Sequence, residues 1–100
     1  KNGGLTHGRR HRDLAQAAGY TISVQETTGS DIAFAAIVHL AQTIPERYLR
    51  CILECRDMVS LRTADGAFDV VDGRVTAPDT PGIGVTPRLE ILGTPVASYF

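Results

Sequence analysis

The sequence predicts an α/β fold with a parallel sheet, and one that forms the end of a larger α/β fold. Helical and strand-like segments alternate along residues 5–54, a pattern typical of strand–helix units that build a parallel sheet. The helical segment at 30–43 is apolar on almost every side, which is typical of a helix covered from several directions. Two strands cannot complete such a sheet, so further strands are expected outside these residues.

A polar helix is predicted from Thr6 to about Ala18, on the outside of the fold. Thr6 can cap its amino end, and Gly19 suits its carboxyl end because glycine adopts the left-handed conformation at little cost. The basic run HGRRHR at 7–12 leaves only a narrow apolar stripe. A solvated face or a contact between subunits is the expected role of this run, because no further basic patch or interleaved aromatic residue accompanies it.

Two short strands and the apolar helix follow. β-Branched residues favour a strand at Tyr20–Gln25. Ser30 or Asp31 can cap a helix that runs to about Thr43, with a proline just beyond its end. Tyr48–Glu54 predicts the second strand, with a helical turn as the alternative.

The last part of the chain predicts short strands and coil. Met58–Thr63 alternates in polarity and predicts a further strand. Ala67–Val71 and Arg74–Ala77 predict a β-hairpin, because the Asp-Gly pair between them suits a type I′ turn. From Pro78 onward, prolines and glycines punctuate a coil that is expected to wrap over a surface.

Composition narrows the classes of function. The 100 residues are 43% hydrophobic and 21% charged with a net charge of −1, which suits a globular unit rather than a disordered tail. The balanced charge gives no general attraction to nucleic acid or to a membrane surface, and no apolar run approaches the ~20 residues of a membrane span. Two cysteines are too few for a disulfide scaffold and indicate a reducing compartment, so a cytoplasmic location is expected.

Polar residues follow both strands of the first half. Those after the first strand are Gln25, Glu26, Thr27 and Thr28. Glu54 stands at the end of the second strand, where it could orient a substrate carboxylate or act in proton transfer. Because ligands of parallel α/β folds bind at the carboxyl ends of strands, these residues form the candidate site. The alternatives are a solvated loop that caps the next helix, and a surface glutamate paired with Arg50 or Arg56.

Two other pairs of residues give weaker evidence of a functional site. His7 and His11 have a spacing that can bind a metal, but no third ligand is evident nearby, and a solvent-facing patch is the alternative. Cys51 and Cys55 do not form a C-x-x-C pair and are expected to be buried free thiols.

Four stretches, in chain order, resemble the mandelate racemase and muconate-lactonizing branch of the enolase superfamily. KNGGLTHGRRHRDLAQAAG resembles the loop and helix after the sixth barrel strand, and IVHLAQTIP resembles the seventh helix. YLRCILE resembles the eighth strand, which commonly ends in an acidic residue, and DGRVTAPDTPGIGVTPRLEILG resembles the closing segment. Each stretch alone is weak, but together they span nearly all of the chain in the right order.

This resemblance implies the C-terminal portion of a modified TIM-type (β/α)7β barrel, with a terminal hairpin and coil that return to an α+β capping domain. Residues 1–57 would supply helix 6, strand 7, helix 7 and strand 8 of the barrel. Residues 58–100 would supply a C-terminal strand, hairpin and coil that pack on the capping domain. The chain would then be the last part of a longer enzyme.

The chemistry that the resemblance implies is Mg²⁺-assisted removal of a proton α to a carboxylate, in a dehydratase, racemase, epimerase or cycloisomerase. Glu54 matches the eighth-strand acid, which contacts the substrate carboxylate or the enolate oxygen, and is the expected catalytic residue. Gln25 and Glu26 match the end of the seventh strand, where the mandelate racemase type carries a histidine. Its absence favours a lysine-based mechanism, and Thr27 and Thr28 would line the pocket.

The resemblance places the remaining machinery outside these residues. The sixth-strand acid/base residue would lie before Lys1, and the metal ligands further upstream, so no metal ligand is expected here and this stretch alone would be inactive. The run GSDIAFAAIVHLAQTIPERYLRC is similar to bacterial members that act on proline-like amino acids, such as cis-3-hydroxyproline dehydratases. The expected partners are a small carboxylate or amino-acid substrate, the rest of the enzyme chain and further copies in a homo-oligomer.

A second hypothesis stays open on the residues alone. A small non-enzymatic domain could oligomerise through the apolar helix at 30–43, because 100 residues offer little else to cover it.

Overall fold

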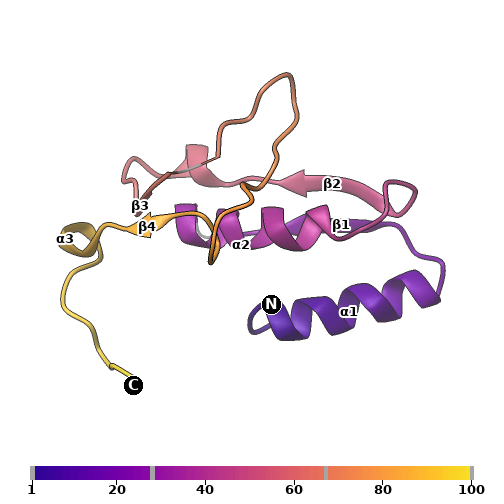
Figure 1. The fold of residues 1–100 in the computed structure, drawn as a ribbon, viewed down its shortest axis with the longest axis horizontal. Coiled ribbons are helices and arrows are strands. Elements are labelled where there is room, and N and C mark those ends of the chain that lie inside the picture. Colours follow the sequence, from indigo (N-terminus) through magenta and orange to yellow (C-terminus); the bar gives the residue numbers. More distant parts are fainter. Residues whose placement is uncertain (1, 28, 67, 100) are drawn as a thin grey trace.

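The computed structural model describes residues 2–27, 29–66 and 68–99, and a β–α–β unit forms its centre (Figure 1). β1 (Ile22–Gln25) and β2 (Leu49–Leu53) pair in parallel. α2 (Asp31–Gln42) connects the two strands and packs against both of them. The parallel pairing predicted from the alternation of strands and helices is confirmed.

α1 (Leu5–Ala17) lies beside α2 on the outside of this unit (Figure 1). The predicted helix is confirmed, as is its end at Gly19, which has a φ of +77°. The predicted cap at Thr6 is wrong: the Gly8 N–H already bonds the Gly4 carbonyl at 3.0 Å, so Thr6 lies inside the first turn. Gly8 faces α2 closely, since a Cβ there would lie 2.9 Å from a methyl carbon of Leu40.

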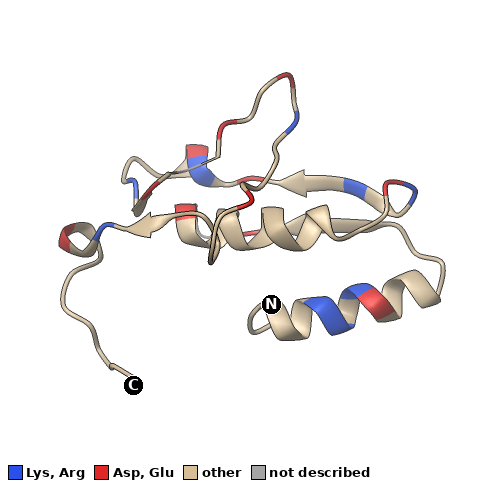
Figure 2. Ribbon diagram, viewed as in Figure 1, with Lys and Arg blue, Asp and Glu red and all other residues tan. Residues whose placement is uncertain are grey.

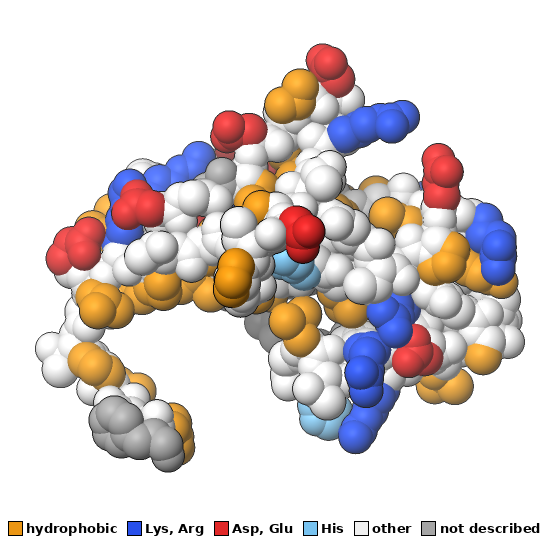
Figure 3. Space-filling view, viewed as in Figure 1, with side chains coloured by type: hydrophobic (Ala, Val, Ile, Leu, Met, Phe, Trp, Pro, Cys, Tyr) orange, Lys and Arg blue, Asp and Glu red, His pale blue; other side chains and the backbone are white. Residues whose placement is uncertain are grey.

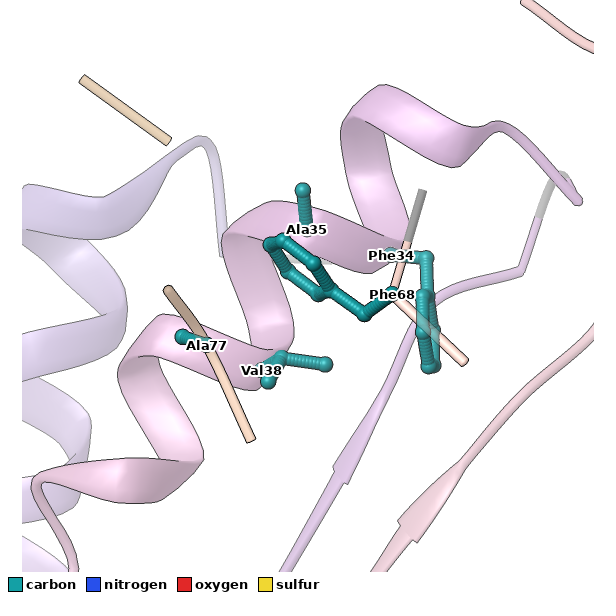
Figure 4. Packing of buried hydrophobic residues seen from close by; sticks show 5 residues of the cluster. All are labelled: Phe34, Ala35, Val38, Phe68 and Ala77. Atoms are coloured by element: carbon teal, nitrogen blue, oxygen red, sulfur yellow. The ribbon is translucent and has the colours of Figure 1, made fainter. Parts of the chain in front are cut away.

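α2 is buried between the sheet and the C-terminal coil. Its Ser30 cap is confirmed, because the Ser30 hydroxyl accepts a hydrogen bond from the Ala33 N–H at 3.4 Å. Asp31, the first residue of this helix, is acidic, and Figure 2 shows the rest of the helix without Lys, Arg, Asp or Glu. Figure 4 shows the packing of one core cluster, which consists of Phe34, Ala35, Val38, Phe68 and Ala77. A second cluster, Val24, Ala41 and Ile44, joins the helix to β1.

The expectation that this chain has too little material to cover α2 is wrong. Every apolar residue of α2 is buried or half-buried. Residues 68–85 provide the cover. Phe68 and Ala77 are buried against the helix, and partly buried apolar residues pack around them, namely Val75, Ile83 and Val85. Burying one phenylalanine side chain contributes about 1.5–3 kcal/mol, so this segment is part of the core.

The elements after β2 are short: η1 (Arg56–Met58), β3 (Ala64–Asp65), β4 (Thr86–Pro87) and α3 (Leu89–Leu92). The predicted strand at Met58–Thr63 is wrong. The Met58 N–H closes a turn on the Cys55 carbonyl at 3.0 Å, and the Thr63 N–H bonds a side chain instead of a neighbouring strand. The strand that does form, β3, pairs antiparallel with β4.

The predicted hairpin is reduced to its turn. Val71 and Arg74 form an isolated antiparallel bridge, and the positive φ values of Asp72 (+50°) and Gly73 (+71°) are those of the type I′ turn. Ala67, where the predicted hairpin begins, lies outside the described residues.

Two surfaces stand out in the space-filling view (Figure 3). Basic side chains gather on α1, and apolar side chains follow α3 and the chain beyond it. Leu89, Leu92, Val96 and Tyr99 are exposed there. In the described part of the chain, no helix has both the length and the apolar character that crossing a membrane requires.

Candidate active site

The two predicted groups of site residues leave the sheet at one edge. Gln25 lies beside Leu53 in the parallel register, and both are the last residues of their strands. The residues that follow, Glu26 and Glu54, therefore begin neighbouring loops at the carboxyl end of the sheet. Thr28, the last member of the first group, lies outside the described residues.

The residues that follow β1 differ in burial. Gln25 and Thr27 are exposed, whereas Glu26 between them is buried. The Glu26 carboxylate accepts hydrogen bonds from the Gly29 N–H at 2.8 Å and from the Cys55 N–H at 2.7 Å. It ties the loop after β1 to the loop after β2, so Gln25 and Thr27 are the residues of this group that are open to a ligand. A part for Glu26 in substrate binding stays a prediction.

Glu54 stands at the border of two hollows in the surface. One has a volume of about 430 Å³ and is lined mainly by charged residues, and the other, of about 530 Å³, follows β2 and the hairpin segment. The Glu54 side chain is 24% exposed and forms an ion pair with the Nε of Arg56. The pairing with Arg56 that the sequence offered as an alternative is therefore present, and it leaves part of the carboxylate open to the hollows.

Arg56 is the buried partner in this pair. Its side chain is 7% exposed, and its guanidinium carbon lies 3.9 Å from the centre of the Phe34 ring. One terminal nitrogen donates to the Phe68 carbonyl at 3.1 Å, and the other lies 3.7 Å from an Asp31 oxygen. Stacking on the ring and these polar contacts fix the guanidinium on every side.

Asp31 anchors this network and is 1% exposed. Its carboxylate accepts from the Thr63 N–H at 2.8 Å and from Arg62 at 3.2 Å. The sequence suggested only a capping role for Asp31. An acidic residue at the start of a helix that is otherwise apolar is the signal that could have marked it as a buried anchor.

An exposed ion pair lines the same charged hollow. Hydrogen bonding from Arg88 holds the pKa of Asp65 below its ordinary value, and the same bond raises the pKa of Arg88. Arg88 donates from Nε to Asp65 at 2.8 Å. The pair connects the end of β3 to the residue that precedes α3.

The described residues do not fit a metal site. Among them, no group of three or more His, Cys, Asp or Glu side chains is placed to hold a metal ion. Glu26 and Asp31 are engaged with backbone N–H groups, and Glu54 is engaged with Arg56. His7 and His11 belong to no such group. Cys51 and Cys55 are free thiols, but the predicted burial holds for Cys55 alone, because Cys51 is half-buried in β2.

Comparison with known proteins decides the family. Residues 1–91 match the family described as "Enolase C-terminal domain-like". The chain belongs to this family. The resemblance read from the sequence is thereby confirmed, and the α/β fold of this enolase C-terminal domain-like chain agrees with its solved relatives.

Individual relatives of this enolase C-terminal domain-like chain are enzymes of the same branch. It is 40% identical over 99 residues to the cis-3-hydroxy-L-proline dehydratase of Roseibium aggregatum, covering 99% of this chain and 27% of that protein. A solved structure described as a mandelate racemase/muconate lactonizing enzyme from Aspergillus oryzae is 75% identical, with a TM-score of 0.89, covering 97% of this chain and 27% of the other.

Another solved structure of the branch, from Roseovarius nubinhibens and complexed with magnesium, is 45% identical with a TM-score of 0.90. The match covers 98% of this chain and 27% of that one. The chain thus spans little more than a quarter of the length of the relatives it matches.

Proposed function

We propose that this chain is the last part of an enzyme that removes the proton α to a carboxylate, and that the substrate is a hydroxyproline-type imino acid. The observation that carries the proposal is the 40% identity with cis-3-hydroxy-L-proline dehydratase across 99% of the chain. Dehydration is the favoured outcome, and epimerisation is the second. Both begin with the same loss of the α proton.

The fold supports a place at the end of a barrel. Residues 1–57 would supply helix 6, strand 7, helix 7 and strand 8, which correspond to α1, β1, α2 and β2. Residues 58–100 would close on an α+β capping domain of the same enzyme. The exposed Leu89, Leu92 and Val96 are suited to that contact, because large apolar side chains gather where one surface covers another.

The residues of this chain would have different roles at the site. Glu54 would contact the substrate carboxylate or the enolate oxygen through a hydrogen bond. Because both groups carry negative charge, this hydrogen bond requires a proton, which Glu54 would take up from solvent before the substrate binds. Gln25 and Thr27, and also Thr28, would line the pocket, and Glu26 would hold the loops that carry them.

In a 3-hydroxy imino acid, the electron pair left by the α proton can expel the neighbouring hydroxyl, which departs as water after it gains a proton. In epimerisation a proton returns to the opposite face of the α carbon.

Mg²⁺ would come from the rest of the enzyme. Magnesium is present in one solved relative, but the described residues include no cluster that would hold it. These residues alone would therefore be inactive. A cytoplasmic enzyme that forms homo-oligomers is part of the same proposal, and the two free cysteines suit a reducing compartment.

The test uses the full-length enzyme with cis-3-hydroxy-L-proline in D2O, followed by proton NMR. Loss of the substrate signals with growth of an unsaturated ring product supports dehydration, and an α-deuterated diastereomer supports epimerisation. L-Proline is the matched control, because it has an α proton but no hydroxyl to expel. Retention of the α proton in every hydroxyproline isomer would contradict the proposal.

The non-enzymatic alternative loses its basis. It required an exposed apolar helix, whereas the apolar residues of α2 are buried or half-buried, and residues 68–85 of the same chain pack against them.

A further inference from the structure

We propose that Arg56 is a positioning residue that fixes the Glu54 carboxylate, and that Asp31 and Phe34 hold Arg56 in place. The inference rests on the proposed contact between Glu54 and the substrate. It assigns a role to a buried arginine that lies two residues beyond the acid and pairs with it.

The orientation of Arg56 is set from three directions. The Phe34 ring lies under the guanidinium at 3.9 Å, the Phe68 carbonyl accepts one terminal N–H at 3.1 Å, and Asp31 lies 3.7 Å from the other terminal nitrogen. A guanidinium is planar and rigid, so fixing its terminal nitrogens also fixes the direction of the Nε–H bond. That bond is the one donated to Glu54.

The supports of Arg56 are themselves buried. Asp31 and Phe34 are each 1% exposed and lie in the first turn of α2. The Asp31 carboxylate is also held by the Thr63 N–H at 2.8 Å. A chain of contacts therefore runs from the core helix through Arg56 to Glu54.

Arg56 is buried and Glu54 is partly exposed, and this difference indicates that the contacts of Arg56 orient the Glu54 carboxylate. Arg56 already has a carboxylate partner in Asp31 and a carbonyl partner in Phe68, so its burial does not depend on Glu54 alone. Glu54 is 24% exposed and would otherwise sample several rotamers at the edge of the hollows. An exposed ion pair gains little because two flexible side chains must be ordered, but here one partner is already ordered. The result is a partly exposed carboxylate with a fixed direction.

The test is a double-mutant cycle on the full-length enzyme, with Arg56→Lys, Glu54→Gln and the double variant. Lysine keeps the charge but has no Nε–H to donate in the same direction. We expect Arg56→Lys to lower kcat by about tenfold or more with little change in KM, because small displacements of an oriented group are costly. On the Glu54→Gln background, the same substitution should change kcat by less than about twofold.

Arg47→Lys is the matched control. Arg47 also stacks on a ring, with its guanidinium carbon 4.8 Å from the centre of Tyr48, but it lies before β2, at the opposite end from Glu54. We expect its kcat to equal that of the wild-type enzyme. If Arg56→Lys does not fold, as judged by circular dichroism, Asp31→Asn takes its place in the cycle, with a smaller loss of kcat and the same dependence on Glu54.

The outcomes separate this inference from the proposed function. If Glu54→Gln lowers kcat and Arg56→Lys does not, the positioning role fails while the role of Glu54 stands. If the two losses multiply in the double variant, Arg56 acts independently of Glu54 and the inference also fails. If Glu54→Gln leaves kcat unchanged, both the role of Glu54 and its positioning are overturned.

Discussion

The Asp31 carboxylate accepts a hydrogen bond from the Thr63 N–H at 2.8 Å, and the Thr63 hydroxyl accepts one from the Asp31 N–H at 3.0 Å. This reciprocal pair fastens the first residue of α2 to the segment that leads into β3. Because α2 also packs on both strands, Asp31 links the sheet unit to the segment before β3.

Loss of the Asp31 side chain should destabilise the enzyme strongly. Asp31→Ala leaves Arg56 buried without one of its carboxylate partners, a change that costs about 3–5 kcal/mol in comparable sites. We expect a clear fall in the melting temperature of the full-length enzyme, measured by scanning calorimetry. Asp57→Ala, at an exposed acid nearby, is the control, and equal melting temperatures for the two variants would refute this role of Asp31.

Gly29 is required by both its backbone and its surroundings. Its φ is +71°, and an added Cβ would lie 2.7 Å from a Val59 methyl and 2.9 Å from the Cys55 carbonyl oxygen. Gly73 has the same φ, but nothing lies within 4 Å of an added Cβ there. Gly73→Ala should cost only the left-handed conformation, about 1–2 kcal/mol. Gly29→Ala should lower the melting temperature further, and equal effects would show that the close contacts do not matter.

The Glu26 carboxylate should matter for stability more than for binding. In Glu26→Gln, the amide nitrogen would face one of the two N–H groups that the carboxylate now accepts, which leaves a buried donor without an acceptor at a cost of about 1–3 kcal/mol. We expect a lower melting temperature with KM nearly unchanged, and no change in either for the exposed Glu46→Gln. A large rise in KM at an unchanged melting temperature would instead support the predicted role of Glu26 in substrate binding.

The Asp65–Arg88 pair should give a small dependence of stability on acid pH. Arg88 holds the pKa of Asp65 below its ordinary value of 3.8, so the pair stabilises the fold above that pH and ceases to do so as the pH falls through the lowered pKa. In Arg88→Gln, the pKa of Asp65 should rise toward 3.8. An NMR titration with carbon-labelled aspartate measures this shift, and an identical pKa in both proteins would contradict it.

Local signals predicted the fold where the chain is regular. β-Branched residues, the Ser30 cap and Gly19 predict β1, α2 and the end of α1, and the structure confirms all three. The turn-rich region was harder, because its structure depends on contacts distant in sequence. The alternation at Met58–Thr63 predicted a strand, but the Asp31 carboxylate takes the Thr63 N–H that a neighbouring strand would need.

The candidate site was predictable in outline. Strand ends identify Gln25 and Glu54, since the carboxyl ends of parallel strands share an edge. The burial of Glu26 and the contacts that join Asp31 to Arg56 were not predictable, because they depend on partners such as Cys55, Thr63 and Phe68 that lie 29–34 positions away along the chain from Glu26, Asp31 and Phe34. The available signal was an acidic residue, Asp31, at the start of an apolar helix. Such a residue does not indicate which side chain or backbone group it will pair with.

The proposed function depends most directly on Glu54. The measurement is kcat of the full-length enzyme and of its Glu54→Gln variant with cis-3-hydroxy-L-proline, with circular dichroism as the check on folding. Removing one oriented contact to developing charge commonly costs about 10²–10³ in rate, so we expect a loss of at least tenfold in a folded variant. Unchanged turnover in a folded Glu54→Gln enzyme would contradict it.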